Sequence, residues 1–126
     1  MKKLLAINLS SEKKDVIWQI CDRIGMIPQE VPRAYWGMKV RDLCSEKELE
    51  EADNITYSGR DLSMDMIVLE GISSRELDIF LDGYKSSGLD PVKLKSMVTD
   101  TNSNWTIEQL YSELAKEYLF YRMRGR

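Results

Sequence analysis

The strongest constraint on the fold is an internal repeat with an offset of 63 positions (73 − 10 = 63) in a chain of 126 residues. The residues that recur are of the kinds that start helices, end helices and open strands. They pair as Ser10 with Ser73, Ser11 with Ser74, Gly25 with Gly88 and Pro28 with Pro91. Apolar positions on the same offset also agree, for example Leu5 with Val68 and Val31 with Leu94. Because the offset is half the chain length, two similar structural units are predicted.

The first unit has the pattern strand, helix, strand. Leu4 to Leu9 is a short apolar run, which suits a buried strand. Ser10 or Ser11 is a suitable cap for the helix that follows, and Gly25 suits its left-handed stop. Met26 to Val31 is the second strand, and its proline at position 28 predicts a place at the edge of the sheet.

The second unit repeats this pattern more clearly. Met64 to Leu69 is a nearly continuous apolar strand, and Ser73 with Glu76 forms a capping box at the start of a helix. Gly88 is predicted to end that helix. In the last strand, Val92 and Leu94 alternate with Lys93 and Lys95, which is typical of a strand with one wet face.

A further helix is predicted at the C-terminal end, where Thr106 and Gln109 form another capping box. The stretch between the two units is less regular. It comprises an aromatic loop at Tyr35–Gly37, a helical turn near Val40, a short helix from Ser45 to Ala52 and a polar, turn-rich segment at 54–63.

These elements predict one α/β domain over residues 1–126, with halves 1–53 and 64–126 joined by the linker 54–63. Two arrangements fit. The first is a ferredoxin-like sheet of four strands, with helices mainly on one face, plus the C-terminal helix. The second is a small doubly wound parallel sheet. The lysines of the last strand favour the first arrangement, because all-parallel sheets are usually covered on both faces.

Charge and hydropathy exclude several classes of function. The net charge is −3 and the pI is about 5.1, so nucleic acid is not a favoured partner, although Arg122, Arg124 and Arg126 are locally basic. No stretch approaches the roughly 18 apolar residues that a membrane span needs. The apolar run after Met1 is too short for a signal peptide. We therefore expect a cytoplasmic protein.

The residue types for common chemistry are scarce. There is no histidine, so the most frequent general base is missing. Cys21 and Cys44 are expected to be small buried hydrophobic residues. Carboxylates lie near the ends of the predicted strands, at Asp61, Asp65, Glu70, Asp90 and Asp100, but their spacing matches no known metal loop. We expect no metal, no cofactor and no catalytic residues, and catalysis is not favoured.

The polar loop before the last helix is the first candidate site. Thr101, Asn104 and Trp105 stand at a predicted helix start, where free amides and the helix dipole can hold an anion. The aromatic loop at Tyr35 and Trp36 is a possible second part of this site. The alternative is structural: Asn104 and Thr106 cap the helix, and Trp105 anchors it to the core.

The end of the chain is the second candidate. Tyr118, Phe120, Tyr121 and Arg122 belong to a run with aromatic and basic residues on all sides of a helix, and such residues are enriched at protein interfaces. A basic aromatic tail that contacts nucleic acid and a frayed helix end are the competing interpretations.

The second half also resembles a known family. The strand Met66–Leu69, the cap segment Ser73–Leu77, Gly88 and the segment Thr99–Thr106 are similar to a small bacterial family, the domain of unknown function 3783. The most specific element is the Thr-x-x-Asn-Trp pattern of Thr101, Asn104 and Trp105. The resemblance covers about residues 64–121. It implies a small cytoplasmic bacterial protein and implies no activity.

The sequence thus leaves the biochemical function open between two hypotheses. The first is a non-catalytic interaction or regulatory module that associates with itself, as a homodimer, or with an unknown protein partner. The second is a binding protein for a small anionic metabolite, using the loop from Thr101 to Trp105.

Overall fold

The computed structural model describes residues 1–45 and 56–124. It contains four β-strands, which are β1 (Lys3–Ile7), β2 (Ile27–Glu30), β3 (Met66–Glu70) and β4 (Leu94–Met97). Its α-helices are α1 (Ser11–Ile24), α2 (Val40–Leu43), α3 (Ser74–Lys85) and α4 (Ile107–Arg124), with 3₁₀ turns at Arg33–Tyr35 and Asn102–Asn104. The helix predicted from Ser45 to Ala52 lies, apart from Ser45, outside the described residues.

The four strands form one mixed sheet in the order β2-β1-β3-β4. Each strand-helix-strand unit contributes two parallel neighbours, β1 with β2 and β3 with β4, and the two units meet where β1 and β3 pair antiparallel. The predicted α/β architecture, with a four-stranded sheet and a C-terminal helix, is confirmed.

The strand order differs from both predicted arrangements. In a ferredoxin-like sheet the two strands of each unit are separated by another strand, whereas here they are direct neighbours. The antiparallel pairing of β1 and β3 also excludes an all-parallel doubly wound sheet.

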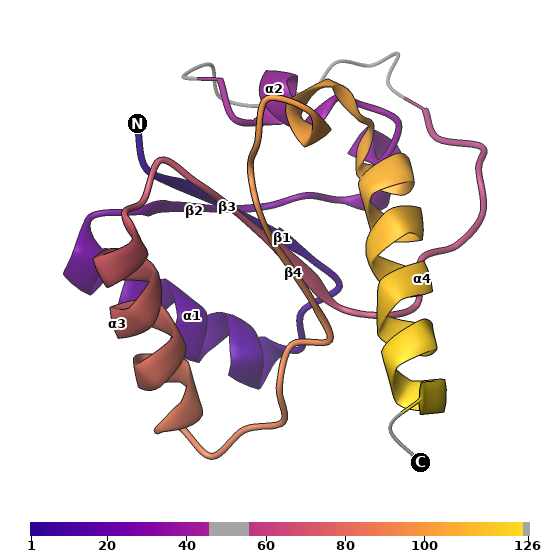
Figure 1. The fold of residues 1–126 in the computed structure, drawn as a ribbon. Coiled ribbons are helices and arrows are strands. Elements are labelled where there is room, and N and C mark those ends of the chain that lie inside the picture. Colours follow the sequence, from indigo (N-terminus) through magenta and orange to yellow (C-terminus); the bar gives the residue numbers. More distant parts are fainter. Residues whose placement is uncertain (46–55, 125–126) are drawn as a thin grey trace.

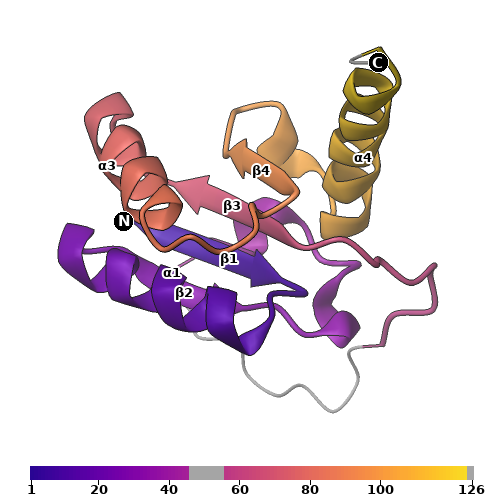
Figure 2. The ribbon, with the colours of Figure 1, turned by 90° about the horizontal axis from the view of Figure 1, so that it is seen from below.

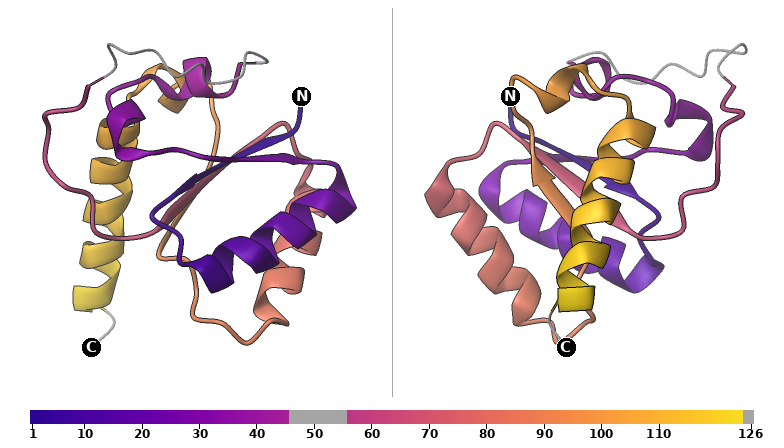
Figure 3. Two further views of the ribbon diagram at one scale, coloured as in Figure 1. Left: turned by 180° about the vertical axis from the view of Figure 1, so that it is seen from behind. Right: turned by 45° about the vertical axis from the view of Figure 1, so that its right-hand side comes forward.

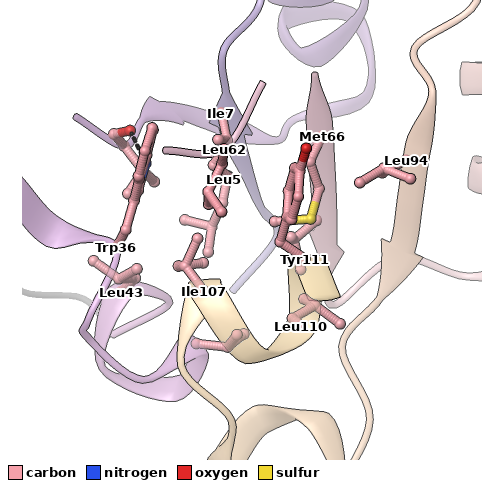
Figure 4. Close-up of a cluster of buried hydrophobic side chains, with 13 residues drawn as sticks. Leu5, Ile7, Trp36, Leu43, Leu62, Met66, Leu94, Ile107, Leu110 and Tyr111 are labelled. Carbon is pink, nitrogen blue, oxygen red and sulfur yellow. Dashed lines mark hydrogen bonds between the residues drawn. The ribbon is translucent and has the colours of Figure 1, made fainter. Parts of the chain in front are cut away.

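Helices cover both faces of the sheet, as Figures 1 and 2 show. On one face, α1 and α3 cover a cluster that includes Leu4, Ala6 and Ile67. On the other, α2 and α4 close a second cluster that includes Leu5 and Val68, drawn in part in Figure 4. The sequence predicted helices mainly on one face of the sheet, and this prediction is wrong. The central strands are apolar on both sides because both sides are buried.

The predicted repeat appears in the geometry of the sheet. In the pairing of β1 with β3, Leu5 lies opposite Val68, its own counterpart at the offset of 63, so the local pseudo-two-fold axis passes through this pair. Ser10 and Ser73 cap α1 and α3 through their side chains. Gly25 and Gly88 both have φ of 74°, the left-handed conformation that favours glycine. Gly25 is the C-terminal cap of α1, as predicted, whereas α3 ends at Lys85 with Ser86 as its cap, so Gly88 lies past the end of its helix.

The offset changes after Gly88. The backbone N–H of Ile27 donates to the carbonyl of Lys2 at 2.9 Å, and the N–H of Leu94 donates to that of Asp65 at 3.1 Å. The two acceptors are 63 positions apart (65 − 2) but the two donors are 67 apart (94 − 27). In the structure, Leu94 is therefore the equivalent of Ile27, whereas the offset of 63 in the sequence pairs Leu94 with Val31. Four additional residues lie in the connection from α3 to β4.

The two outer strands form the sheet edges. The N–H groups of Ile27 and Val31 point inward to β1, so Pro28, which has no N–H, stands where a donor would face outward. The predicted edge position of Pro28 is confirmed.

Candidate functional site

The two loops that the sequence singled out lie against each other. The N–H of Val40 donates to the carbonyl of Trp105 at 2.9 Å, and Lys39 and Thr106 form an isolated antiparallel bridge. The aromatic loop and the loop before α4 are thus one structural unit at the N-terminal end of α4, although about 65 residues separate them in sequence (105 − 40 = 65).

The first amides of α4 all have acceptors. The N–H of Ile107 donates to the carbonyl of Met38 and that of Glu108 to the carbonyl of Trp36, each at 3.1 Å. The N–H of Gln109 donates to the hydroxyl of Thr106 at 3.1 Å. A helix N-terminus binds an anion through free amides, and here the protein itself uses these donors. Thr106 is the cap residue of α4 and Asn104 is not.

The five residues proposed for ligand binding have different surroundings. Trp36 is 5% exposed and its indole N–H donates to the carbonyl of Val31 at 3.3 Å. Tyr35 and Trp105 are partly buried against the same core cluster. Thr101 and Asn104 are exposed, and the guanidinium of Arg41 lies 3.0 Å from the amide oxygen of Asn104. These side chains share one region, but the aromatic ones serve the core.

The residue that holds this loop is Asn102, which sequence reasoning missed. Its side chain is buried, accepts a hydrogen bond from the N–H of Thr99 at 2.8 Å and donates to the carbonyl of Met97 at 2.9 Å. Asn102 thereby satisfies backbone groups at the end of the edge strand β4. The only available signal was its place between turn residues, where asparagine often bonds the backbone.

A cluster of aromatic rings and cations fixes the residues before β3 onto α4. The guanidinium of Arg33 lies 5.1 Å from the ring centre of Tyr57, and its NH2 nitrogen is 2.7 Å from a carboxylate oxygen of Asp61. The hydroxyl of Tyr57 donates to Glu108. Burial, followed by this hydrogen bond to Glu108, raises the pKa of Tyr57 to about 12. These groups are engaged with one another, which indicates a structural role.

The last turns of α4 present the second candidate surface. Leu119, Phe120, Tyr121 and Met123 are 53, 55, 71 and 79% exposed. The guanidinium of Arg122 lies over the ring of Tyr118 at 5.8 Å, and the rings of Phe120 and Tyr121 meet edge to face at 5.9 Å. Figure 3 shows these turns extending past the sheet. We call residues 118–123 the terminal patch.

The carboxylates considered as metal ligands are dispersed. Within residues 1–45 and 56–124, no group of three His, Cys, Asp or Glu side chains is arranged to hold a metal ion. Asp65 is buried and forms an ion pair with Lys13 at 2.6 Å. Cys21 is buried and Cys44 is partly buried, and both are free thiols.

Comparison with known proteins adds one finding. Residues 65–121 match the domain of unknown function DUF3783. The matched segment holds all of β3, α3 and β4, and α4 as far as Tyr121. The resemblance expected from the Thr-x-x-Asn-Trp pattern is therefore confirmed over the second half of the chain. No curated protein and no solved structure matches the chain. None of the helices in the described residues is long and apolar enough to cross a membrane.

Proposed function

We propose that this protein is a non-catalytic interaction module that associates with a second copy of itself through the terminal patch. The observation that carries the proposal is the exposure of four large apolar side chains within residues 119–123 of one helix. Exposed apolar side chains that gather in this way are typical of protein-interaction sites. Aromatic residues, methionine and arginine are also enriched at interfaces.

The charges along α4 favour a second copy in antiparallel orientation. Glu108, Glu113 and Glu117 precede Arg122 and Arg124 along the helix, with Lys116 as the exception. An antiparallel helix pair centred between Leu119 and Phe120 places Glu117 of one copy level with Arg122 of the other. Such a two-fold contact is self-complementary. A parallel pair would instead oppose like charges.

The setting of this activity is part of the proposal. Both cysteines of the chain lie in the described residues, and both are free thiols. Free thiols fit a reducing compartment. We therefore place the module in the cytoplasm, in keeping with the bacterial origin that the resemblance implies. A small patch predicts a weak dimer, with a dissociation constant in about the micromolar range.

Sedimentation velocity over a wide concentration range tests self-association. The Phe120→Ala/Tyr121→Ala variant is expected to weaken the dimer about 30-fold, since central aromatic residues often contribute about 2 kcal/mol. Ile79→Ala, which removes an exposed apolar side chain from α3, is the matched control. A protein that stays monomeric at millimolar concentration, or a control that weakens the dimer equally, contradicts the proposal.

A charge swap tests the antiparallel geometry. Glu117→Arg and Arg122→Glu should each weaken the dimer, because each places like charges level with each other. The double variant should recover most of the affinity. A double variant as weak as the two single ones would exclude this arrangement.

A further inference from the structure

A cavity of about 380 Å³ lies between α3 and the sheet, on the face opposite α4. Its walls are apolar and come from β3, α3 and the connection to β4. They include Ile67, Phe80, Tyr84, Leu89 and Val92. The volume falls within the range of roughly 300 to 1,000 Å³ that is usual for small-molecule sites.

The imperfect repeat explains why space is present here. In the first half only residues 25 and 26 join α1 to β2, whereas residues 86–93 join α3 to β4. The longer connection supplies Leu89, Pro91 and Val92 to the cavity wall. In addition, the smaller Leu81 stands where the first half has Trp18 (81 − 63 = 18), which packs against the core.

The polar groups around the cavity are cationic. Lys85 of α3 and Lys95 of β4 line it, and both are exposed. Neither forms an ion pair among the residues that the structure describes. The hydroxyl of Tyr84 donates to the carbonyl of Asp90, so this ring offers the cavity an apolar surface.

The nearby carboxylates do not neutralise these lysines. Asp82 is exposed on α3, one turn before Lys85, and makes no ion pair in the described part of the chain. Asp90 lines a neighbouring, more open depression together with Lys93, Lys95 and Tyr118. Among the cavity-lining residues themselves, the charged side chains are lysines.

We propose that this cavity binds a small amphipathic carboxylate, with an apolar chain or ring between α3 and the sheet and its carboxylate held by Lys85 and Lys95. The apolar wall accounts for the tail of the ligand and the two unpaired ammonium groups for its charge. The lining of the cavity contains no residue of the terminal patch, although Lys95 also borders the neighbouring depression that Tyr118 lines. Binding in the cavity does not depend on self-association.

Three probes with the same tail test the proposal: decanoate and decylamine, each below its micelle concentration, and 1-decanol below its solubility limit. Each is titrated into ¹⁵N-labelled protein and followed by amide shifts. Decanoate should shift the amides of Ile67, Leu89 and Val92 and bind about tenfold more tightly than decanol, the effect of one charge-assisted contact. Decylamine should bind least.

Variants separate the tail from the charge. Lys85→Gln/Lys95→Gln should reduce the affinity for decanoate about tenfold, to that of decanol, while Lys39→Gln, an exposed lysine outside the cavity, leaves it unchanged. Leu81→Trp gives the second half the tryptophan that the first half has at the equivalent position, residue 18. The larger side chain should fill the cavity and abolish binding of decanoate and decanol. If Leu81→Trp does not fold, the lysine pair, at exposed positions, still decides.

Three results would overturn the proposal. One is no shift with decanoate or decylamine at millimolar concentration. Another is equal affinity for decanoate and decanol, because the lysines then contribute nothing. The third is a set of shifts confined to residues 118–123, which would show that the probe binds the terminal patch.

Discussion

The ammonium group of Lys13 in α1 lies 2.6 Å from a carboxylate oxygen of Asp65, just before β3. The offset of 63 carries Lys13 to Glu76 (13 + 63) and carries Lys2 to Asp65 (2 + 63). Lys2 and Glu76 are also joined by an ion pair. The two pairs occupy equivalent places in the repeat with their charges exchanged. Each pair ties the helix of one half to the strand of the other.

Replacing Asp65 with alanine should strongly destabilise the protein. The two side chains of the Lys13–Asp65 pair are only 16 and 9% exposed, and Asp65 also accepts the N–H of Lys93 at 2.8 Å. Alanine leaves both donors without their acceptor, so we expect a loss of about 3 kcal/mol in urea unfolding. Asp15→Ala, at an exposed position of α1, should change stability by less than about 0.5 kcal/mol. Similar effects of the two variants would show that the pair contributes little.

The Lys2–Glu76 ion pair should make the stability of the protein depend on pH in the acidic range. The hydrogen bond from Lys2, followed by that from the backbone N–H of Ser73, lowers the pKa of Glu76 below 4.5. Between the folded and unfolded pKa values the unfolded chain binds a proton that the folded protein does not, so acidification favours unfolding. The stability that this carboxylate provides is therefore present above pH 4.5 and lost as the pH falls below it.

Melting temperatures of the wild type and Glu76→Gln between pH 7 and 3 check this prediction. The difference between the two proteins should shrink as the pH falls through that window. Asp78→Asn, which removes an exposed carboxylate from the same helix, is the control. A difference that stays constant down to pH 3 would contradict the assignment.

Local features were predictable from the sequence because they depend on neighbouring residues. The side-chain caps at Ser10 and Ser73, the left-handed glycines at 25 and 88 and the edge position of Pro28 all follow from short-range rules. The strand order was not predictable in this way. Nothing within either half shows that β1 and β3 pair antiparallel.

One signal for the second helical layer was present in the sequence. The apolar run of β1 has no polar alternation, and such a run indicates cover on both faces. The alternating lysines near β4 pointed to a wet face instead, because β4 is an edge strand and Lys95 lies at the rim of a cavity. The residue pattern of an edge strand therefore did not predict that helices cover both faces of the central strands.

The candidate loop shows the same division between local and distant effects. The sequence correctly placed a cap at Thr106. It suggested that the first amides of α4 are free to bind a ligand. In the structure these amides donate to the carbonyls of Trp36 and Met38, which lie in a distant segment of the sequence. That contact depends on how the two halves pack.

Asn102 and Asn104 should differ in their contribution to stability. Asn102→Ala leaves the N–H of Thr99 and the carbonyl of Met97 without their buried partner, and we expect a loss of about 2 kcal/mol. Asn104 is exposed and does not cap α4, so Asn104→Ala should change stability by less than about 0.5 kcal/mol. Urea unfolding of both variants checks this. A larger loss for Asn104→Ala would return the cap role to that residue.

The two thiols should react slowly with alkylating reagents in the native protein. Burial is the main cause that raises the pKa of Cys44 to about 11 and that of Cys21 to about 12, from an ordinary value of 9.0. The thiolate is the reactive form of cysteine. Because the pKa of Cys44 rises from 9.0 to about 11, the thiolate fraction at pH 8 falls about a hundredfold. Cys21 is also sterically shielded.

Iodoacetamide labelling at pH 8, followed by mass spectrometry, measures both rates with and without urea. We expect unfolding to accelerate Cys44 by about a hundredfold, the change in its thiolate fraction, and Cys21 by more. Cys44 is only partly buried, so its protection rests on the pKa as much as on access. Rapid native labelling of Cys44 alone would mean that it is more accessible and more acidic than its packing indicates. Equal protection of both thiols beyond a hundredfold would mean that global unfolding controls the reaction.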